Sequence, residues 1–242
     1  MPSPTVVLVP GACHGAWWYA PAVDALAARG HRALAVTLPG VGERADELDA
    51  TTNLAGHVAD LVTQLGRTDG ELVLVGHSYG GMVIAGVADA LPGRVAGLCV
   101  VDGFAPEDGD SCWSSVNDAM RAWYVEGAAR TGVLVDPMPQ FDARATGHPL
   151  ASLVQRITLT GAHHDVATRH YALAAHPAWT AVSPFPEVAE RLRADPTWTV
   201  HDLPTTHDVL ADGPDVLVGL VETVLADVGG GRVSPPTPAR GT

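Results

Sequence analysis

Ser78 lies at the centre of a five-residue motif that could make its hydroxyl a nucleophile. The motif Gly76-His77-Ser78-Tyr79-Gly80 directly follows the apolar run 72–75 and directly precedes the apolar segment 81–85. This order predicts a strand, a sharp turn with the serine at its bend, and a helix. We call this turn the elbow and the strand before it the elbow strand, and the flanking glycines allow the turn to close. The N-terminus of that helix favours negative charge near the serine. An ordinary glycine-rich turn is the alternative interpretation, but it does not require this flanking order.

A serine hydroxyl is a weak nucleophile at neutral pH, so Ser78 requires a histidine base and a carboxylate that orients the base. His207 is the candidate base among the 11 histidines, because it lies in the loop after the last predicted strand and precedes an amphipathic segment. His77 is interpreted as structural, because the side chain of a neighbour in this turn points away from that of the serine.

Two aspartates are candidates for the carboxylate. Asp102 ends the predicted strand 95–101, which follows the elbow strand in chain order, and Asp165 follows the apolar stretch 157–159. The acid ordinarily follows the penultimate strand, but the segment His176-Pro177-Ala178-Trp179 carries no carboxylate there. This favours Asp102 and leaves Asp165 as the alternative acid, while a plain surface or turn aspartate is the structural interpretation of either.

Acyl transfer also requires hydrogen-bond donors for the oxyanion of the intermediate. We expect one donor to be the backbone N–H of Tyr79, which follows the nucleophile, and the other to come from the loop 10–15 after the first predicted strand. Ala12 is the candidate in that loop, because its small neighbours let the backbone approach a reacting carbonyl.

The elements that must position these residues alternate along the chain. Short apolar segments predict strands at 5–9, 32–37, 71–75, 95–101, 170–174 and 198–203. Helical patterns lie between them at 17–29, 53–65, 80–91, 184–194 and 214–227. This alternation predicts an α/β fold with a mostly parallel sheet covered by helices on both faces, in which the strand ends converge on one crevice.

Residues 105–165 interrupt the alternation and are predicted to form a small helical cap over the strand ends. The segment 111–130 has a helical pattern with an apolar stripe. We predict an apolar or aromatic substrate pocket, with core packing as an equal alternative, from four tryptophans: Trp17, Trp18, Trp113 and Trp123.

Length and composition restrict the function further. The 242 residues fit a single domain at 1–228, with a Gly/Pro-rich tail at 229–242 that is predicted to be disordered. The net charge of −13 argues against nucleic-acid binding. The N-terminus shows neither a signal peptide nor a membrane span, and three cysteines without metal or redox spacing suggest a cytoplasmic protein.

No metal site is predicted from the histidine-rich segment near residue 165. His163, His164 and Asp165 with His170 match no ligand spacing, and adjacent histidines are expected to diverge.

At these motifs the chain resembles the α/β-hydrolase superfamily, and more narrowly the branch of plant methylesterases and α/β-fold hydroxynitrile lyases. The resemblance rests on residues 9–17, 38–40, 76–81 and 206–208. It implies the α/β-hydrolase fold, Ser78 as nucleophile, His207 as base, and Ala12 and Tyr79 as oxyanion donors.

Two departures from that branch are informative. Plant members carry their acid after the penultimate strand, whereas the segment 101–106 resembles haloalkane dehalogenases and actinobacterial relatives, which places the acid at Asp102. The lyases use a lysine beside the catalytic histidine and a threonine in the oxyanion loop; here Asp208 and Gly11 stand there, and the chain contains no lysine. The esterase-like reaction is therefore favoured over the lyase reaction.

We therefore expect a serine hydrolase that cleaves a small carboxylic ester, or a related acyl substrate, through an acyl-enzyme without a cofactor. A biosynthetic tailoring enzyme that uses the same site for cyclisation, lactonisation or thioester release is one alternative, and a non-catalytic ligand-binding homologue is another. Homodimer formation is left open.

Overall fold

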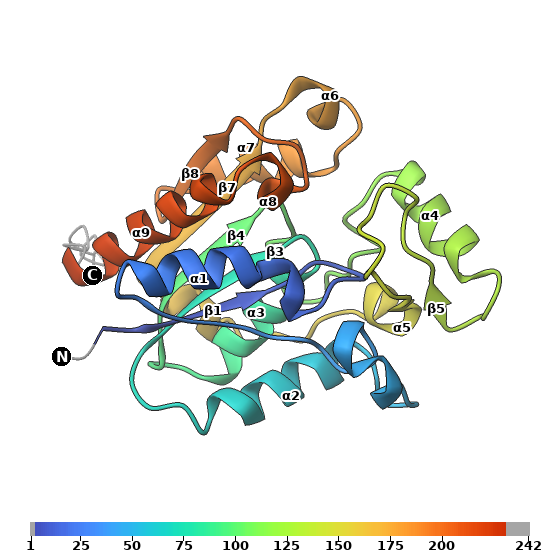
Figure 1. Cartoon of the computed structure of the whole chain (residues 1–242), viewed down its shortest axis with the longest axis horizontal. Coiled ribbons are helices and arrows are strands. Elements are labelled where there is room, and N and C mark those ends of the chain that lie inside the picture. The colour runs from blue at the N-terminus through green and yellow to red at the C-terminus, as the bar shows by residue number, and fades with distance from the viewer. Residues whose placement is uncertain (1–2, 231–242) are drawn as a thin grey trace, which may run out of the picture.

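A parallel β-sheet forms the centre of the molecule in the computed structural model, which describes residues 3–230 (Figure 1). Within these residues the sheet has six strands in the order β2-β1-β3-β4-β7-β8, and each strand is parallel to its neighbours. The strands are β1 (Thr5–Val9), β2 (Arg32–Ala35), β3 (Leu72–His77), β4 (Val95–Val101), β7 (Thr168–Ala174) and β8 (Trp198–Leu203). The predicted parallel α/β fold is confirmed, and the bounds of β1, β4 and β8 agree with those expected.

Helices cover both faces of the sheet, so the central strands β1, β3 and β7 are buried along their whole length. The principal helices are α1 (Ala20–Ala28), α2 (Leu54–Leu65), α3 (Gly80–Ala90), α7 (Phe185–Arg193) and α9 (Pro214–Gly230). Alternate residues of β1 show the division, because Val7 and Val9 pack in the core under α2 and α3, whereas Val6 and Leu8 pack under α1 and α9.

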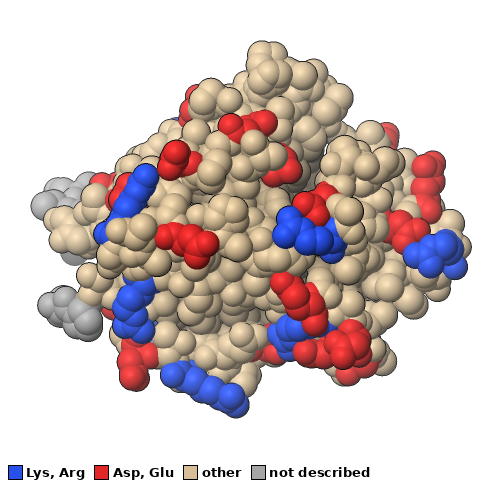
Figure 2. All heavy atoms as spheres, in the orientation of Figure 1, with Lys and Arg blue, Asp and Glu red and all other residues tan. Residues whose placement is uncertain are grey.

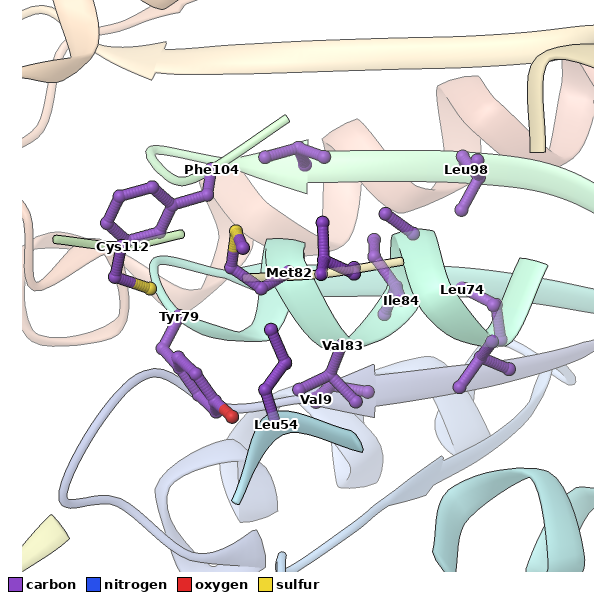
Figure 3. Packing of buried hydrophobic residues seen from close by; sticks show 14 of the residues in the cluster. Val9, Leu54, Leu74, Tyr79, Met82, Val83, Ile84, Leu98, Phe104 and Cys112 are labelled. Atoms are coloured by element: carbon purple, nitrogen blue, oxygen red, sulfur yellow. The ribbon is translucent and has the colours of Figure 1, made fainter. Parts of the chain in front are cut away.

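Helix α3, which begins directly after the elbow, contributes the densest apolar packing. Figure 3 shows Met82, Val83 and Ile84 among side chains of the neighbouring strands, including Leu74 and Leu98. All of these side chains are almost completely buried. The helix that carries the Ser78 turn is therefore fixed on the sheet by hydrophobic burial.

The segment between β4 and β7 forms the predicted cap beyond the strand ends (Figure 1). It contains α4 (Asp118–Ala128), an antiparallel pair of short strands, β5 (Leu134–Val135) and β6 (His148–Pro149), and then α5 (Leu150–Val154) and a 3-10 turn, η3 (Ala162–Asp165). Shorter elements elsewhere are η1 (Ala16–Tyr19), η2 (Gly42–Glu47), α6 (Pro177–Thr180) and α8 (Val209–Asp212).

The cap helix is shorter than the pattern 111–130 predicts. The Ser111 and Ser114 hydroxyls hydrogen bond with each other's backbone, which stabilises a turn instead of a helix. Asn117 then caps α4 by accepting a hydrogen bond from the N–H of Met120. Trp113 therefore precedes the helix and does not share a helical face with Trp123.

The remaining expectations concern the ends of the chain and its surface. Helix α9 continues to Gly230, two residues into the predicted tail, and the rest of that predicted tail lies outside the described residues. Among the described residues, no helix is both long and apolar enough to span a bilayer. On the face shown in Figure 2, acidic and arginine side chains are interspersed, and no basic patch is visible there.

The turns that follow β3 and β4 are in direct backbone contact. The N–H of Ser78 donates to the carbonyl of Val101 at 3.1 Å, and the N–H of Phe104 donates to the carbonyl of Ser78 at 3.2 Å. Glycine is required at Gly81, because a Cβ atom there would lie 2.0 Å from the carbonyl oxygen of Phe104.

We predict that Gly81→Ala destabilises the fold by ~3 kcal/mol or more, because the added methyl group must displace backbone and not a flexible side chain. Urea denaturation measures the free energy of unfolding. Gly219→Ala in α9 is the matched control: its Cβ meets nothing within 4 Å, and the loss of a helical glycine should stabilise the protein by about 0.5–1 kcal/mol. Equal effects at both positions would contradict the proposed close approach.

Candidate active site

Ser78 occupies a strained turn between β3 and α3. Its φ angle is 52°, in the left-handed region that non-glycine residues rarely adopt. A Cβ atom at Gly80 would lie 2.3 Å from the carbonyl oxygen of Val9, so only glycine fits beside the β1 strand end. The turn holds the Ser78 side chain at the wall of a cavity above the sheet.

Asp102 lies on the neighbouring turn after β4 and is also left-handed, with φ 41°. Its side chain is fully buried, and both carboxylate oxygens accept hydrogen bonds. Oδ2 accepts from His207 Nδ1 at 2.6 Å and from the indole Nε1 of Trp179 at 2.7 Å, while Oδ1 accepts from the backbone N–H of Ala174 at 3.1 Å. Three donors therefore replace the water that this carboxylate loses on burial.

His207 lies in the loop between β8 and α8 and is oriented by contacts on several sides. Because Asp102 can only accept, the short bond places a proton on His207 Nδ1 and leaves the lone pair on Nε2. The rings of Trp179 and Phe185 stack against the imidazole, with centroids 4.6 and 5.8 Å away. Ser78 and His207 line the same cavity, but within residues 3–230 no hydrogen bond joins the Ser78 hydroxyl to His207. Such bonds are often long before substrate binds.

His77 contacts the loop that contains His207 and holds its backbone in place. Its Nε2 donates to the backbone carbonyl of His207 at 2.9 Å, and the two rings lie 4.5 Å apart. Burial, together with the nearby His207, holds the pKa of His77 well below its usual value. His77 is thus a neutral residue under the candidate base, in line with its interpretation as structural.

Two residues that line the cavity beside Ser78 carry backbone N–H groups that could act as donors. Within the described part of the chain, the N–H groups of Ala12 and Tyr79 have no hydrogen-bond acceptor, although both residues line the cavity. The loop after β1 is packed tightly here, since a Cβ atom on Gly11 would lie 3.0 Å from that of Ser78. Free N–H groups in this position are the donors that an oxyanion requires.

The cavity has a volume of about 210 Å³ and a mostly apolar wall. The cap supplies one side of it, and the segment 179–185 supplies another. Its side-chain lining beyond Ser78 and His207 includes His14, Trp18, Met120, Trp123, Tyr124, Met138, Gln140, Phe141, Leu153, Trp179 and Phe185. No arginine is among these lining residues, and the only carboxylate is that of the exposed Asp208.

Only part of the predicted tryptophan pocket is found. Trp18 and Trp123 line the cavity, whereas Trp17 and Trp113 do not. Trp17 lies under the guanidinium of Arg144, 4.2 Å from the ring centroid, and Trp113 is 38% exposed because it precedes α4. The prediction was wrong for Trp113 because it assumed one continuous cap helix, and it was wrong for Trp17 because that ring in η1 packs against Arg144 outside the cavity.

The structure also separates Asp165 from the site. Asp165 is exposed in η3, and its carboxylate has no hydrogen bond to His207.

The neighbouring rings of His163 and His164 do not diverge as expected but lie 4.0 Å apart. Side chains of both, with Glu107, bring possible ligand atoms within 4.8 Å of one another. In the structure these histidines instead contact carboxylates, and Arg191 lies 3.5 Å from Glu107.

A buried network of hydrogen bonds holds the side chain of Tyr79. The Tyr79 hydroxyl donates to His57 Nδ1 at 2.8 Å, and His57 Nε2 donates to the carbonyl of Pro39 at 3.0 Å. The carbonyl of Pro39 holds a proton on Nε2, so that Nδ1 of the neutral ring accepts from the Tyr79 hydroxyl. Burial lowers the pKa of His57 to about 4 and also holds that of His148 well below its usual value.

The sequence of this chain is similar to the model of the Alpha/beta hydrolase family over residues 6–238. A carbendazim hydrolyzing esterase from Nocardioides sp. is 34% identical over 87% of this chain and 95% of that protein. Esterase PIR7B from Oryza sativa is 35% identical over 50% of this chain, but the match spans only 46% of the rice protein. Among solved structures, an extracellular alpha/beta-hydrolase from a Paenibacillus species has a TM-score of 0.78 at 17% identity, covering 91% of this chain and 98% of that one.

The neutral state of His57 predicts acid-sensitive stability. Between pH 6.5 and about 4, the unfolded chain binds a proton at His57 that the folded chain excludes, so the free energy of unfolding falls as the pH falls through this range. The contribution of His57 is ~3 kcal/mol. Urea denaturation at several pH values should show a shallower pH dependence for His57→Gln than for the wild type.

The exposed His176 offers a matched control for this measurement. His176→Gln should leave the contribution of His57 in place, because this exposed ring lies outside the buried network of His57. If His57→Gln and the wild type had equal slopes, His57 would not be held neutral by the fold.

Proposed function

Because the chain belongs to the α/β hydrolase family, we propose that it is a serine hydrolase that cleaves a small, uncharged carboxylic ester. The observation that carries the proposal is the 2.6 Å bond between His207 and the buried Asp102, at a cavity that also contains Ser78. Relatives named esterase and methylesterase support an ester as the substrate.

In the proposed reaction, Ser78 Oγ attacks the ester carbonyl carbon while His207 Nε2 takes the hydroxyl proton. The carbonyl oxygen becomes negatively charged and accepts hydrogen bonds from the N–H groups of Ala12 and Tyr79. The tetrahedral intermediate then collapses, and the alcohol leaves with the proton held by His207. Water deprotonated by His207 releases the acid from the acyl-enzyme and regenerates Ser78.

Asp102 serves this reaction without giving up its charge. Its Oδ2 holds the proton on His207 Nδ1, so Nε2 is free to act as the base. When His207 becomes an imidazolium, the adjacent carboxylate stabilises the new positive charge. Burial strengthens that interaction, because little water is present to screen it.

The cavity wall supports an apolar acyl or alcohol group on the substrate. Phe141, Trp123 and Met120 of the cap line the cavity, and no arginine lines it in the described structure. A substrate carboxylate would lose its hydration here without gaining an ion pair. We therefore infer that neutral esters are the preferred class. Cytoplasmic location and homodimer formation stay predictions from the sequence.

We expect Ser78→Ala and Asp102→Asn each to lower kcat for a 4-nitrophenyl ester by about 10⁴-fold or more, because each removes a member of the proposed triad. A fluorophosphonate probe should label the wild type at Ser78 and leave Ser78→Ala unlabelled. Asp165→Asn is the matched control and should stay within about twofold of the wild type, since Asp165 is exposed outside the cavity. Ester turnover that survives in Ser78→Ala would refute the proposal, and folded wild type that the probe cannot label would indicate a binding protein.

Asp208 at the cavity wall should discriminate against anionic substrates. Its carboxylate also caps α8 by accepting a hydrogen bond from the N–H of Ala211, a role that asparagine can retain. We compare 4-nitrophenyl hexanoate with mono-4-nitrophenyl adipate, which have acyl chains of equal length. Asp208→Asn should reduce the preference in kcat/KM for the neutral ester by about two- to fivefold, and less at high salt. An unchanged preference would exclude Asp208 from substrate selection.

A further inference from the structure

Trp179 occupies the position at which the sequence departs from the expected triad. It lies in α6, directly after β7, where a carboxylate is expected and none is present. Its indole Nε1 donates to Asp102 Oδ2 at 2.7 Å, and its ring stacks on the imidazole of His207 with an interplanar angle of 27°. One side chain therefore contacts both the candidate acid and the candidate base.

The hydrogen bond and the ring stacking of Trp179 both constrain the hydrogen bond between His207 and Asp102. Asp102 Oδ2 accepts from both His207 and Trp179, so the indole holds that oxygen in place while His207 approaches it. The stacked ring limits rotation of the imidazole away from the carboxylate. Without the indole, His207 itself and the backbone N–H of Ala174, on the other oxygen, would be the donors to Asp102 that remain among the described residues.

Helix α6 is itself tied to the His207 loop. The N–H of His176 donates to the carbonyl of Thr205 at 3.0 Å, and the N–H of Ala175 donates to that of Leu203 at 2.8 Å. After α6, the carbonyl of Val182 accepts a hydrogen bond from the side chain of Asn117, the residue that caps the cap helix α4. Trp179 is thus held between the loop that carries His207 and the start of the cap helix.

We propose that Trp179 is a positioning residue that fixes the Asp102 carboxylate and the His207 ring for proton transfer, from the chain position where an acid would otherwise be expected. The inference rests on the proposed esterase function. Trp179 acts through Asp102 and His207 and takes no part in bond making or breaking. Its ring also forms cavity wall, so the hydrogen bond and the apolar surface must be separated experimentally.

Trp179→Phe makes that separation, because phenylalanine retains an aromatic wall and lacks the N–H. With 4-nitrophenyl hexanoate we expect kcat to fall about tenfold, equivalent to ~1.4 kcal/mol, and KM to stay within about twofold. Turnover is expressed per serine titrated by the fluorophosphonate probe, so unfolded protein does not enter the value. Trp113→Phe is the matched control, since Trp113 lies outside the cavity, and it should leave kcat unchanged.

A double-mutant cycle tests whether Trp179 acts through Asp102. In the Asp102→Asn background, where the charged acceptor is absent, Trp179→Phe should change the residual rate by less than about twofold. An equal loss in both backgrounds would show that Trp179 does not act through Asp102 and would overturn the proposal. The spectroscopic counterpart is the far-downfield proton resonance of the His207–Asp102 bond, which should move in Trp179→Phe and stay in place in Trp113→Phe.

The outcomes distinguish this inference from the function on which it rests. A wild type that neither hydrolyses esters nor reacts with the probe overturns the proposed function. An active wild type with Trp179→Phe of equal kcat overturns the role of Trp179 alone. A larger KM with unchanged kcat would also overturn it, because Trp179 would then only form part of the substrate-binding wall.

Discussion

The parallel pairing of β3 with β4 is the constraint on which the rest of the site depends. It brings the ends of these strands together, and each strand ends in a left-handed residue, Ser78 on one and Asp102 on the other. Hydrogen bonds between the two turns then fix their separation. Strain at both residues is tolerated because α3 and the flanking strands are packed in the core, and that packing offsets the cost of holding the backbone in a rare conformation.

A buried charge sets the second requirement. The carboxylate of Asp102 has no access to solvent, so the surrounding structure must supply donors in place of water. One comes from the β7 backbone, one from the loop after β8 and one from α6, which are separate parts of the chain. The Asp102 carboxylate thus links the end of β7 to the loop after β8 and to α6. Its three hydrogen bonds form together only when all three segments are correctly folded.

The sequence was sufficient to predict the sheet and to propose candidate site residues that lie together in the structure, because both depend on local patterns. Apolar runs and the glycines around Ser78 report the strands and the elbow directly, and the shared direction of parallel strands makes the neighbouring Asp102 accessible to inference. The cavity wall was harder to predict, because the turn formed by Ser111 and Ser114 delays the start of the helix until after Trp113 and leaves only Trp123 within it. The role of Trp179 depends on a contact across the sheet, although the missing carboxylate beside it was a signal that something must replace an acid there.

The division of labour between sheet and cap has a consequence for how such a chain can diversify. Ser78, Asp102 and His207 lie on turns and loops that directly follow strands of the sheet. Most of the apolar cavity wall comes from one continuous segment between β4 and β7. That segment can accumulate insertions and replacements without altering strand order or the turns that hold the reacting groups. The exception is the aromatic wall after β7, where Trp179 lines the cavity and also donates a hydrogen bond to Asp102. Drift in substrate preference should therefore be easy in the cap and rare around α6, so related chains can share their chemistry while differing in the compounds they accept.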